Sequence, residues 1–159
     1  MTTSEQILLC AFIFSVGMGV GGGVYETRVV YPNWIKDPTP DGLGEKLASS
    51  GQSGAARRYW PLISPMSALL AVLNAFVAWH QNGLVRTLWL TSSVSIIIKS
   101  ASTYGYFVPT YIRRIARAET MDIMALRRVV HTWANLSPLR VLVETLAWIT
   151  GMWALMILK

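Results

Sequence analysis

Four long apolar runs constrain this chain more than any other feature. A membrane-spanning helix needs roughly 20 mainly apolar residues, and such runs cover about residues 7–31, 61–79, 84–108 and 138–158. Apolar residues make up 53% of the 159 residues and charged residues only 14%, compared with about 25% charged residues in soluble domains. The sequence therefore predicts a multi-pass membrane protein with a single transmembrane domain over residues 1–159.

The connections between the runs predict an all-α, integral membrane four-helix up-down bundle, because two connections are long and one is short. In the second long connection, apolar residues recur at helical spacing after Thr120, which predicts an additional interfacial helix over about residues 120–135. Ser137 and Pro138 are of the types favoured at an N-cap and at a first helical position. We therefore expect the last span to begin there.

Basic residues set the predicted orientation. Nine of them lie in the two long connections: Lys36, Lys46, Arg57, Arg58, Arg113, Arg114, Arg117, Arg127 and Arg128. Only Arg86 and Lys159 flank the opposite side. The positive-inside rule then places the long connections in the cytoplasm and both termini on the non-cytoplasmic side of a cell (inner) membrane. Without a groove-reading motif, the net charge of +6 does not indicate nucleic-acid binding.

One face of each run carries small or polar residues at intervals of three and four. Lipid is a poor partner for such a stripe, so we expect the stripes to face one another in a polar seam. The stripes are Ser15, Gly19, Gly22 and Glu26; Ser64, Ser67, Ala71, Asn74 and Ala78; Ser92, Ser95, Lys99, Ser102 and Tyr106; and Arg140, Glu144, Ala147 and Gly151. For the serines, helix packing and interhelical hydrogen bonds explain the pattern without a function.

Charged residues in the seam are the candidate catalytic groups. A charge at the centre of a span costs about 2.5–3.5 kcal/mol, so pairing is expected, and intramembrane ionisable residues indicate a functional site. Arg140 and Glu144 are four residues apart and can pair on one helix face. Glu26 is then expected to pair with Lys99 across the bundle, while Arg28 either reaches the membrane surface or points inward.

Metal- and nucleotide-dependent chemistry is poorly supported by the sequence. His80 and His131 lie on opposite sides of the membrane in the predicted topology, and Cys10 is the only cysteine. No metal-ligand spacing is present, and the glycines of 17–23 lie inside an apolar run rather than in a phosphate-binding loop. We therefore expect neither a metal nor a cofactor.

The chemistry that the sequence still supports is acid–base catalysis on an apolar ligand. Glu26 or Glu144 is a candidate base for a weakly acidic C–H group, and Lys99 or Arg140 is a candidate partner for the resulting enolate oxygen.

Aromatic and polar residues near the cytoplasmic interface are the candidate substrate-binding residues: Tyr104, Tyr106, His131, Trp133 and Asn135. His131 and Asn135 share a helix face and are expected to point into the site. For the aromatic residues, simple anchoring at the membrane surface is the alternative.

Three stretches of the chain resemble the anthrone oxygenase-like family of small four-helix membrane proteins. The first is the glycine-rich run that leads into Gly23-Val-Tyr25-Glu26 and Val30-Tyr-Pro32-Asn-Trp34, and the second is Tyr104-Gly-Tyr106-Phe-Val-Pro109. The third is Trp133-Ala-Asn135-Leu-Ser-Pro-Leu-Arg140. The resemblance implies a cofactor-independent oxygenase that converts anthrone-type polyketides to quinones with molecular oxygen. It carries over Glu26, Asn135 and Arg140 as site positions.

The leading hypothesis is a small membrane-embedded enzyme, an oxidoreductase acting on an apolar enolisable aromatic or quinone-like substrate. The first alternative is a non-catalytic subunit or assembly module. In that case the Gly17–Gly23 face, which contains two GxxxG spacings, binds a membrane protein or a second copy of the chain. The second alternative is a small-anion carrier, which is less favoured because no internal repeat or broken helix is present.

Overall fold

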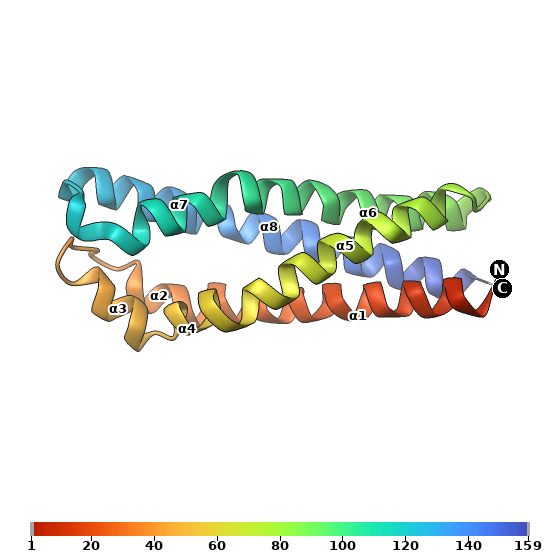
Figure 1. Ribbon diagram of the computed structural model, residues 1–159, viewed down its shortest axis with the longest axis horizontal. Coiled ribbons are helices and arrows are strands. Elements are labelled where there is room, and N and C mark those ends of the chain that lie inside the picture. The colour runs from red at the N-terminus through yellow and green to blue at the C-terminus, as the bar shows by residue number, and fades with distance from the viewer. Residues whose placement is uncertain (1, 159) are drawn as a thin grey trace.

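The computed structural model describes residues 2–158, and over this range the chain is helical without a strand. Its four longest helices are α1 (Thr3–Tyr25), α5 (Trp60–Trp79), α6 (Gly83–Ser102) and α8 (Ile123–Ile157). They run along the long axis of the molecule, and both termini lie at the same end (Figure 1). The predicted all-α class is confirmed. Lys159, which contributed to the predicted charge asymmetry, lies outside the described residues.

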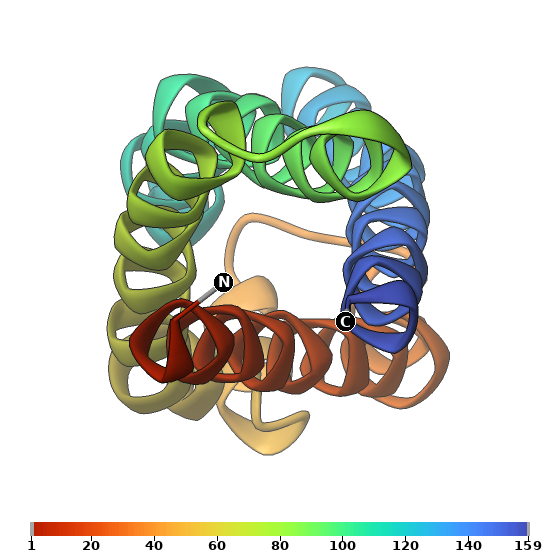
Figure 2. The same ribbon diagram turned by 90° about the vertical axis from the view of Figure 1, so that its right-hand side faces the viewer.

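The four long helices form a closed ring. α1 packs beside α5 and α8, and α6 packs beside the same two helices. The view along the axis shows α1 and α6 on opposite sides of this ring (Figure 2). Side chains of α1 are therefore expected to contact those of α5 and α8 more readily than those of α6.

Three helical segments in the described part of the chain are long and apolar enough to cross a membrane, judged by length and composition. They are Thr3–Trp34, Gln52–Trp79 and Ile123–Ile157. The run predicted at 84–108 forms α6 but is not among these three. α6 buries polar residues, including Ser92, Ser93 and Lys99, inside the ring, and these lower its hydropathy.

α8 corrects two predictions. The helix predicted over 120–135 is not separate from the helix of the last span, and the latter helix does not begin at Ser137, because α8 continues through Pro138 without interruption. The Ser137 hydroxyl donates to the Trp133 carbonyl at 2.9 Å, so it bonds back into the same helix instead of capping a new one.

The N-cap of α8 is Asp122 rather than Thr120. Its carboxylate accepts hydrogen bonds from the backbone N–H groups of Met124 and Ala125, at 2.9 and 3.1 Å. This arrangement satisfies two of the donors that every helix leaves free at its start.

We call the four long helices, with the turns that continue them, the rods. Three of them have a short π-helical turn at the end away from the termini. These turns are η1 (Glu26–Val30) after α1, η2 (Ala55–Tyr59) before α5 and η3 (Thr103–Phe107) after α6. A proline follows two residues after each of them, at Pro32, Pro61 and Pro109. Proline lacks an N–H group, and its ring clashes with the carbonyl four residues earlier. The preceding turn widens as a result, and such wide turns are frequent at functional sites.

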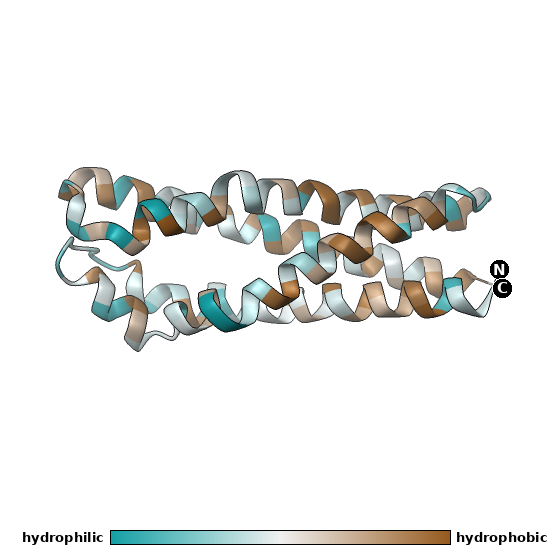
Figure 3. Ribbon diagram, viewed as in Figure 1, coloured by the Kyte–Doolittle hydropathy of each residue, from teal (hydrophilic) through white to brown (hydrophobic). Residues whose placement is uncertain are grey.

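Short helices close this end of the ring. η1 leads into α2 (Tyr31–Trp34), η3 leads into α7 (Val108–Arg113), and between the rods lie α3 (Leu43–Ser49), α4 (Gln52–Gly54) and η4 (Ile115–Thr120). A buried cluster joins α3, η4 and α8 through Leu43, Leu47, Ile115, Ala118 and Leu126. We call this closure the cap. Hydrophilic residues mark α3, η2 and α7, whereas α5 is mainly hydrophobic further along the rod (Figure 3).

The half of the ring near the termini is a packed apolar core. It contains Leu9, Phe12, Val16, Ala71, Ala78, Trp89, Ile96, Ala147 and Ala154. Within it, the Asn74 amide donates to the Leu70 carbonyl at 2.8 Å and accepts from Trp89 Nε1 at 2.9 Å. The Leu70 bond lies within α5, and the Trp89 bond joins α6 to α5, which is the role that buried amides commonly have between membrane helices.

Candidate functional site

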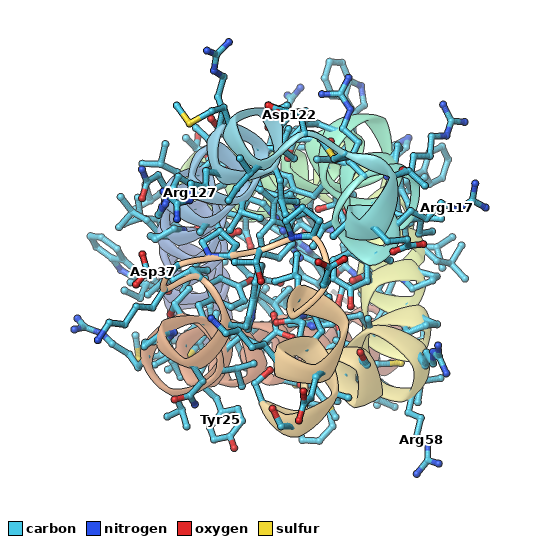
Figure 4. All side chains as sticks on the ribbon, turned by 90° about the vertical axis from the view of Figure 1, so that its left-hand side faces the viewer. Tyr25, Asp37, Arg58, Arg117, Asp122 and Arg127 are labelled. Atoms are coloured by element: carbon cyan, nitrogen blue, oxygen red, sulfur yellow. The ribbon has the colours of Figure 1, made fainter. Side chains whose placement is uncertain are left out.

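A cavity of about 890 Å³ lies between the rods at the capped end. Most of the wall is apolar, and its residues come from η1, α2, α3, α4, η2, α5, η3, α7, η4 and α8. The volume is within the range of about 300–1,000 Å³ that is usual for small-molecule sites. Viewed from the capped end, Arg58 and Arg117 point away from the molecule, so these charges do not fill the interior (Figure 4).

Glu26 lies in the cavity wall with its carboxylate held by three donors. Oε1 accepts from Trp60 Nε1 at 2.6 Å and from Gln52 Nε2 at 3.3 Å, and Oε2 accepts from the Tyr31 hydroxyl at 3.2 Å. These donors belong to α5, α4 and α2, so three separate segments fix the orientation of one carboxylate. Among residues 2–158, no cation lies within ion-pair distance of it.

Arg140 supplies a positive charge in the same cavity wall. Its guanidinium carbon lies 4.2 Å from the centroid of the Phe107 ring, a cation–π geometry that holds the side chain without using its N–H donors. Its buried Nε has no hydrogen-bond acceptor in the described part of the chain. Arg140 therefore has donor capacity available for an oxyanion.

Lys99 and Glu144 form a separate ion pair. Lys99 Nζ lies 2.7 Å from Glu144 Oε1, and each side chain is only 3% exposed. Neither residue lines the cavity. The predicted pairings of Glu26 with Lys99 and of Arg140 with Glu144 are therefore wrong. The reason is the order of the helices around the ring, since α6 packs on α8 and lies opposite α1.

Two of the five candidate binding residues line the cavity, Tyr104 and Trp133. The Trp133 indole donates to the Phe107 carbonyl at 3.1 Å, and its ring centroid lies 5.3 Å from that of Tyr31. Tyr104 is 45% exposed at the opening of the cavity. Nearby, burial raises the pKa of the Tyr111 hydroxyl in the lining, which keeps it a neutral hydrogen-bonding group.

Tyr106, His131 and Asn135 are exposed and lie outside the cavity lining. Phe107 is the residue of η3 that points inward next to Tyr106. On α8 the buried face is formed by Val130, Trp133, Ala134 and Ser137. His131 and Asn135 share a face, as their spacing predicts, but it is the outer face.

The sequence interpretation missed the three donors to Glu26, which are Tyr31, Gln52 and Trp60. A signal for two of them is present, because Tyr31 and Trp60 each stand directly before one of the prolines that follow the wide turns. Gln52 carries no such signal. It reaches the carboxylate only because the first long connection folds into short helices against the end of the ring.

The glycine face of α1 is covered within the chain. A Cβ atom at Gly23 would lie 2.8 Å from Val141 Cγ2, one at Gly22 would lie 2.6 Å from the Tyr59 ring, and one at Gly19 would collide with the Glu144 carboxylate. Of the glycines between residues 17 and 23, only Gly21 faces open space. The Gly17–Gly23 face is therefore engaged with α8 and Tyr59, which leaves little of it for the partner or second copy expected from the sequence.

No group of three or more His, Cys, Asp or Glu side chains in the range 2–158 is placed to hold a metal ion. Comparisons of the chain with protein-family models, with curated proteins and with solved structures gave no match. The resemblance to the anthrone oxygenase-like family stays a prediction from short motifs.

Proposed function

We propose that this protein is a membrane-embedded enzyme that removes a proton from an apolar, enolisable aromatic or quinone-like ketone bound in the cavity. The observation that carries this proposal is the pair of unmatched charges in one cavity wall. Glu26 has donors but no ion-pair partner, Arg140 has an unused donor, and the other two buried charges neutralise each other. Ionisable groups without ion-pair partners in a large, mainly apolar pocket favour a catalytic site.

In this mechanism the Glu26 carboxylate takes a proton from a C–H carbon that is conjugated with the substrate carbonyl, which in anthrone is the methylene opposite the carbonyl in the central ring. The C–H electron pair moves into the enolate, and Arg140 stabilises the negative charge that develops on the oxygen. Trp60, Gln52 and Tyr31 are positioning residues, because they fix the carboxylate without contacting the reacting carbon.

Oxygenation is the continuation that the family resemblance favours. The enolate carbon transfers electrons to molecular oxygen and forms a C–O bond, which gives a peroxide on that carbon. Loss of the second C–H proton and cleavage of the O–O bond then give a new carbonyl group and water. For a methylene carbon the balance is CH₂ + O₂ → C=O + H₂O, so no cofactor is required by the stoichiometry.

The test uses anthrone as the substrate and the full chain in liposomes, with oxygen uptake and anthraquinone absorbance as readouts. Glu26→Gln is expected to lower the protein-dependent rate at least about 100-fold, which is the usual contribution of a general base. Glu119→Gln, on an exposed residue of η4, is the matched control and should retain the wild-type rate. An unchanged rate in Glu26→Gln, or no anthrone oxidation by the wild type above the spontaneous rate, would overturn the proposal.

We also propose that α6 crosses the membrane as a fourth span, giving the up-down bundle. α6 has 20 residues, which is about 30 Å of helix, the thickness of the hydrocarbon core. Three crossings would leave the termini on opposite sides, yet both lie at one end of the molecule. The basic residues of the cap favour a cytoplasmic location for the capped end. The termini, at the other end, are then on the non-cytoplasmic side of a cell inner membrane.

A further inference from the structure

The exposed residues of the cavity lining show where the cavity opens. Arg57, Pro61 and Pro65 come from one face of η2 and α5, and Tyr104, Val108, Ile112 and Ala116 come from one face of η3, α7 and η4. Gly44 and Ala48 of α3 complete the exposed part of the lining. All nine are exposed, and each set repeats at intervals of four residues. The opening therefore lies in the side wall of the ring, between α5 and the η3–α7 segment, and it extends to α3 and η4 at the edge of the cap. α5 runs obliquely in Figure 1, next to α6 near the termini and away from α7 near the cap.

The route along the axis is closed by the cap. Leu43, Leu47 and Ile115 of the cap are buried, with exposed fractions of 0%, 3% and 1%. They pack against α8 in the same cluster that includes Tyr31 and Trp133 of the cavity wall. A ligand entering through the centre of the cap would have to displace this packed layer, whereas the exposed lining residues Gly44, Ala48 and Ala116 lie at its edge, next to the side opening.

The rim of the side opening is apolar along α5, η3 and α7. Pro61, Pro65, Val108 and Ile112 carry no charge, and Tyr104 contributes an aromatic ring. Arg57 adds a positive charge to the rim, at its cap end. Glu26 and Arg140 belong to the buried wall behind this rim. The cavity is therefore polar at its closed side and, apart from Arg57 at the cap end, apolar at its open side.

We infer that the gap between α5 and α7 is a lateral portal through which the substrate enters from the lipid phase. This inference rests on the proposed function, because it takes the rods as membrane-spanning. It narrows the substrate class to aromatic ketones that dissolve in the bilayer. The carbonyl oxygen lies against Arg140 and the acidic carbon against Glu26, and apolar substituents elsewhere on the rings extend through the portal into lipid.

The test uses benzophenone, an aromatic ketone that inserts into nearby C–H bonds on illumination and has no enolisable hydrogen. Binding is thereby separated from turnover. The full chain in lipid nanodiscs is mixed with benzophenone and illuminated after increasing delays, and labelled residues are mapped by mass spectrometry. Label on the cavity residues Ser64, Thr103 and Phe107 is expected, and it should fall in proportion when empty liposomes dilute benzophenone in the lipid.

Val108→Phe/Ile112→Phe narrows the portal and should slow the appearance of this interior label several-fold while the final level changes little. Ile98→Phe is the matched control, since Ile98 is 63% exposed on α6 and lies outside the lining. Water-soluble benzophenone-4-sulfonate should label the same residues poorly.

Equally fast interior labelling by the sulfonate, an unchanged rate in the portal variant, or no interior label at all would overturn the portal. Labelling with the expected dependence, combined with no effect of Glu26→Gln on anthrone oxidation, would retain the portal and reject the proposed enzyme chemistry.

Discussion

The ion pair between Lys99 and Glu144 places two full charges inside the ring of helices. Taking either charge out of water is costly, and only the partner at 2.7 Å offsets that cost. Because the two residues lie on neighbouring helices, the pair also joins α6 to α8. The contrast with Glu26 is informative, since that carboxylate is surrounded by neutral donors and remains available to a ligand.

Breaking this pair should destabilise the protein strongly. In Glu144→Gln the Lys99 ammonium remains buried without a counter-charge, and we expect a loss of about 3–5 kcal/mol in the free energy of unfolding. Unfolding by SDS in mixed micelles, followed by circular dichroism, measures this loss, and Glu119→Gln is the exposed control.

The double variant Lys99→Met/Glu144→Leu should recover most of the lost stability, because no unpaired charge is left. A double variant as unstable as Glu144→Gln would contradict this explanation and would indicate that side-chain shape at these positions matters more than charge.

Close contact between α1 and α8 depends on glycine at particular positions along one helix. Gly23→Val would force the helices apart, because even a Cβ atom there lies 2.8 Å from Val141, and overpacking of this kind typically costs about 1–3 kcal/mol. Gly21→Val meets nothing within 4 Å and is the matched control.

The measurement is the midpoint of thermal unfolding of both variants in the same detergent. Wild type and Gly21→Val are expected to unfold at about the same temperature, and Gly23→Val at a clearly lower temperature. Equal loss in both variants would mean that helix propensity, rather than contact with α8, determines the effect.

Helical periodicity predicted the inner faces of some elements well. On α5, Ser64, Ser67, Ala71, Asn74 and Ala78 are all buried, because the run is one regular helix and its small residues mark a single stripe. The burial of Glu26, Lys99 and Glu144 followed from the same reasoning, since lipid excludes charge.

Other elements could not be predicted by this reasoning. On α6 the predicted polar stripe, which included Ser95 and Ser102, only partly matches the buried face. The centre of that face includes the apolar residues Trp89 and Ile96, which a search for polar residues does not find. The break predicted at Pro138 was wrong because a proline is tolerated inside a well-packed membrane helix. The Lys99–Glu144 partnership depends on the order of the helices around the ring, which spacing along the chain does not encode.

At the scale of the whole molecule, the charges are distributed unevenly between the two ends. Basic residues gather at the cap, and the termini and the short α5–α6 connection lie at the other end. If the rods cross a membrane, this asymmetry determines which end stays in the cytoplasm.

Orientation can be measured with single cysteines in a Cys10→Ser background. Asn82→Cys in the short connection should react with a membrane-impermeant maleimide in intact cells, whereas Ser49→Cys in the cap should react only after the cells are opened. Both native residues are exposed, so reactivity reports sidedness rather than burial. The reverse pattern would invert the proposed topology, and labelling of both sites in intact cells would contradict the four-span arrangement.

The apolar core and the cavity occupy different halves of the molecule. This separation affects how such a chain can change during evolution. Side chains that shape the cavity, such as Ser64, Thr103, Tyr104 and Val108, make no contribution to the apolar core around Phe12, Trp89 and Ile96. Substitutions of these cavity side chains are therefore expected to leave that core intact, so the shape of the cavity can change through single mutations without compensating changes in the core.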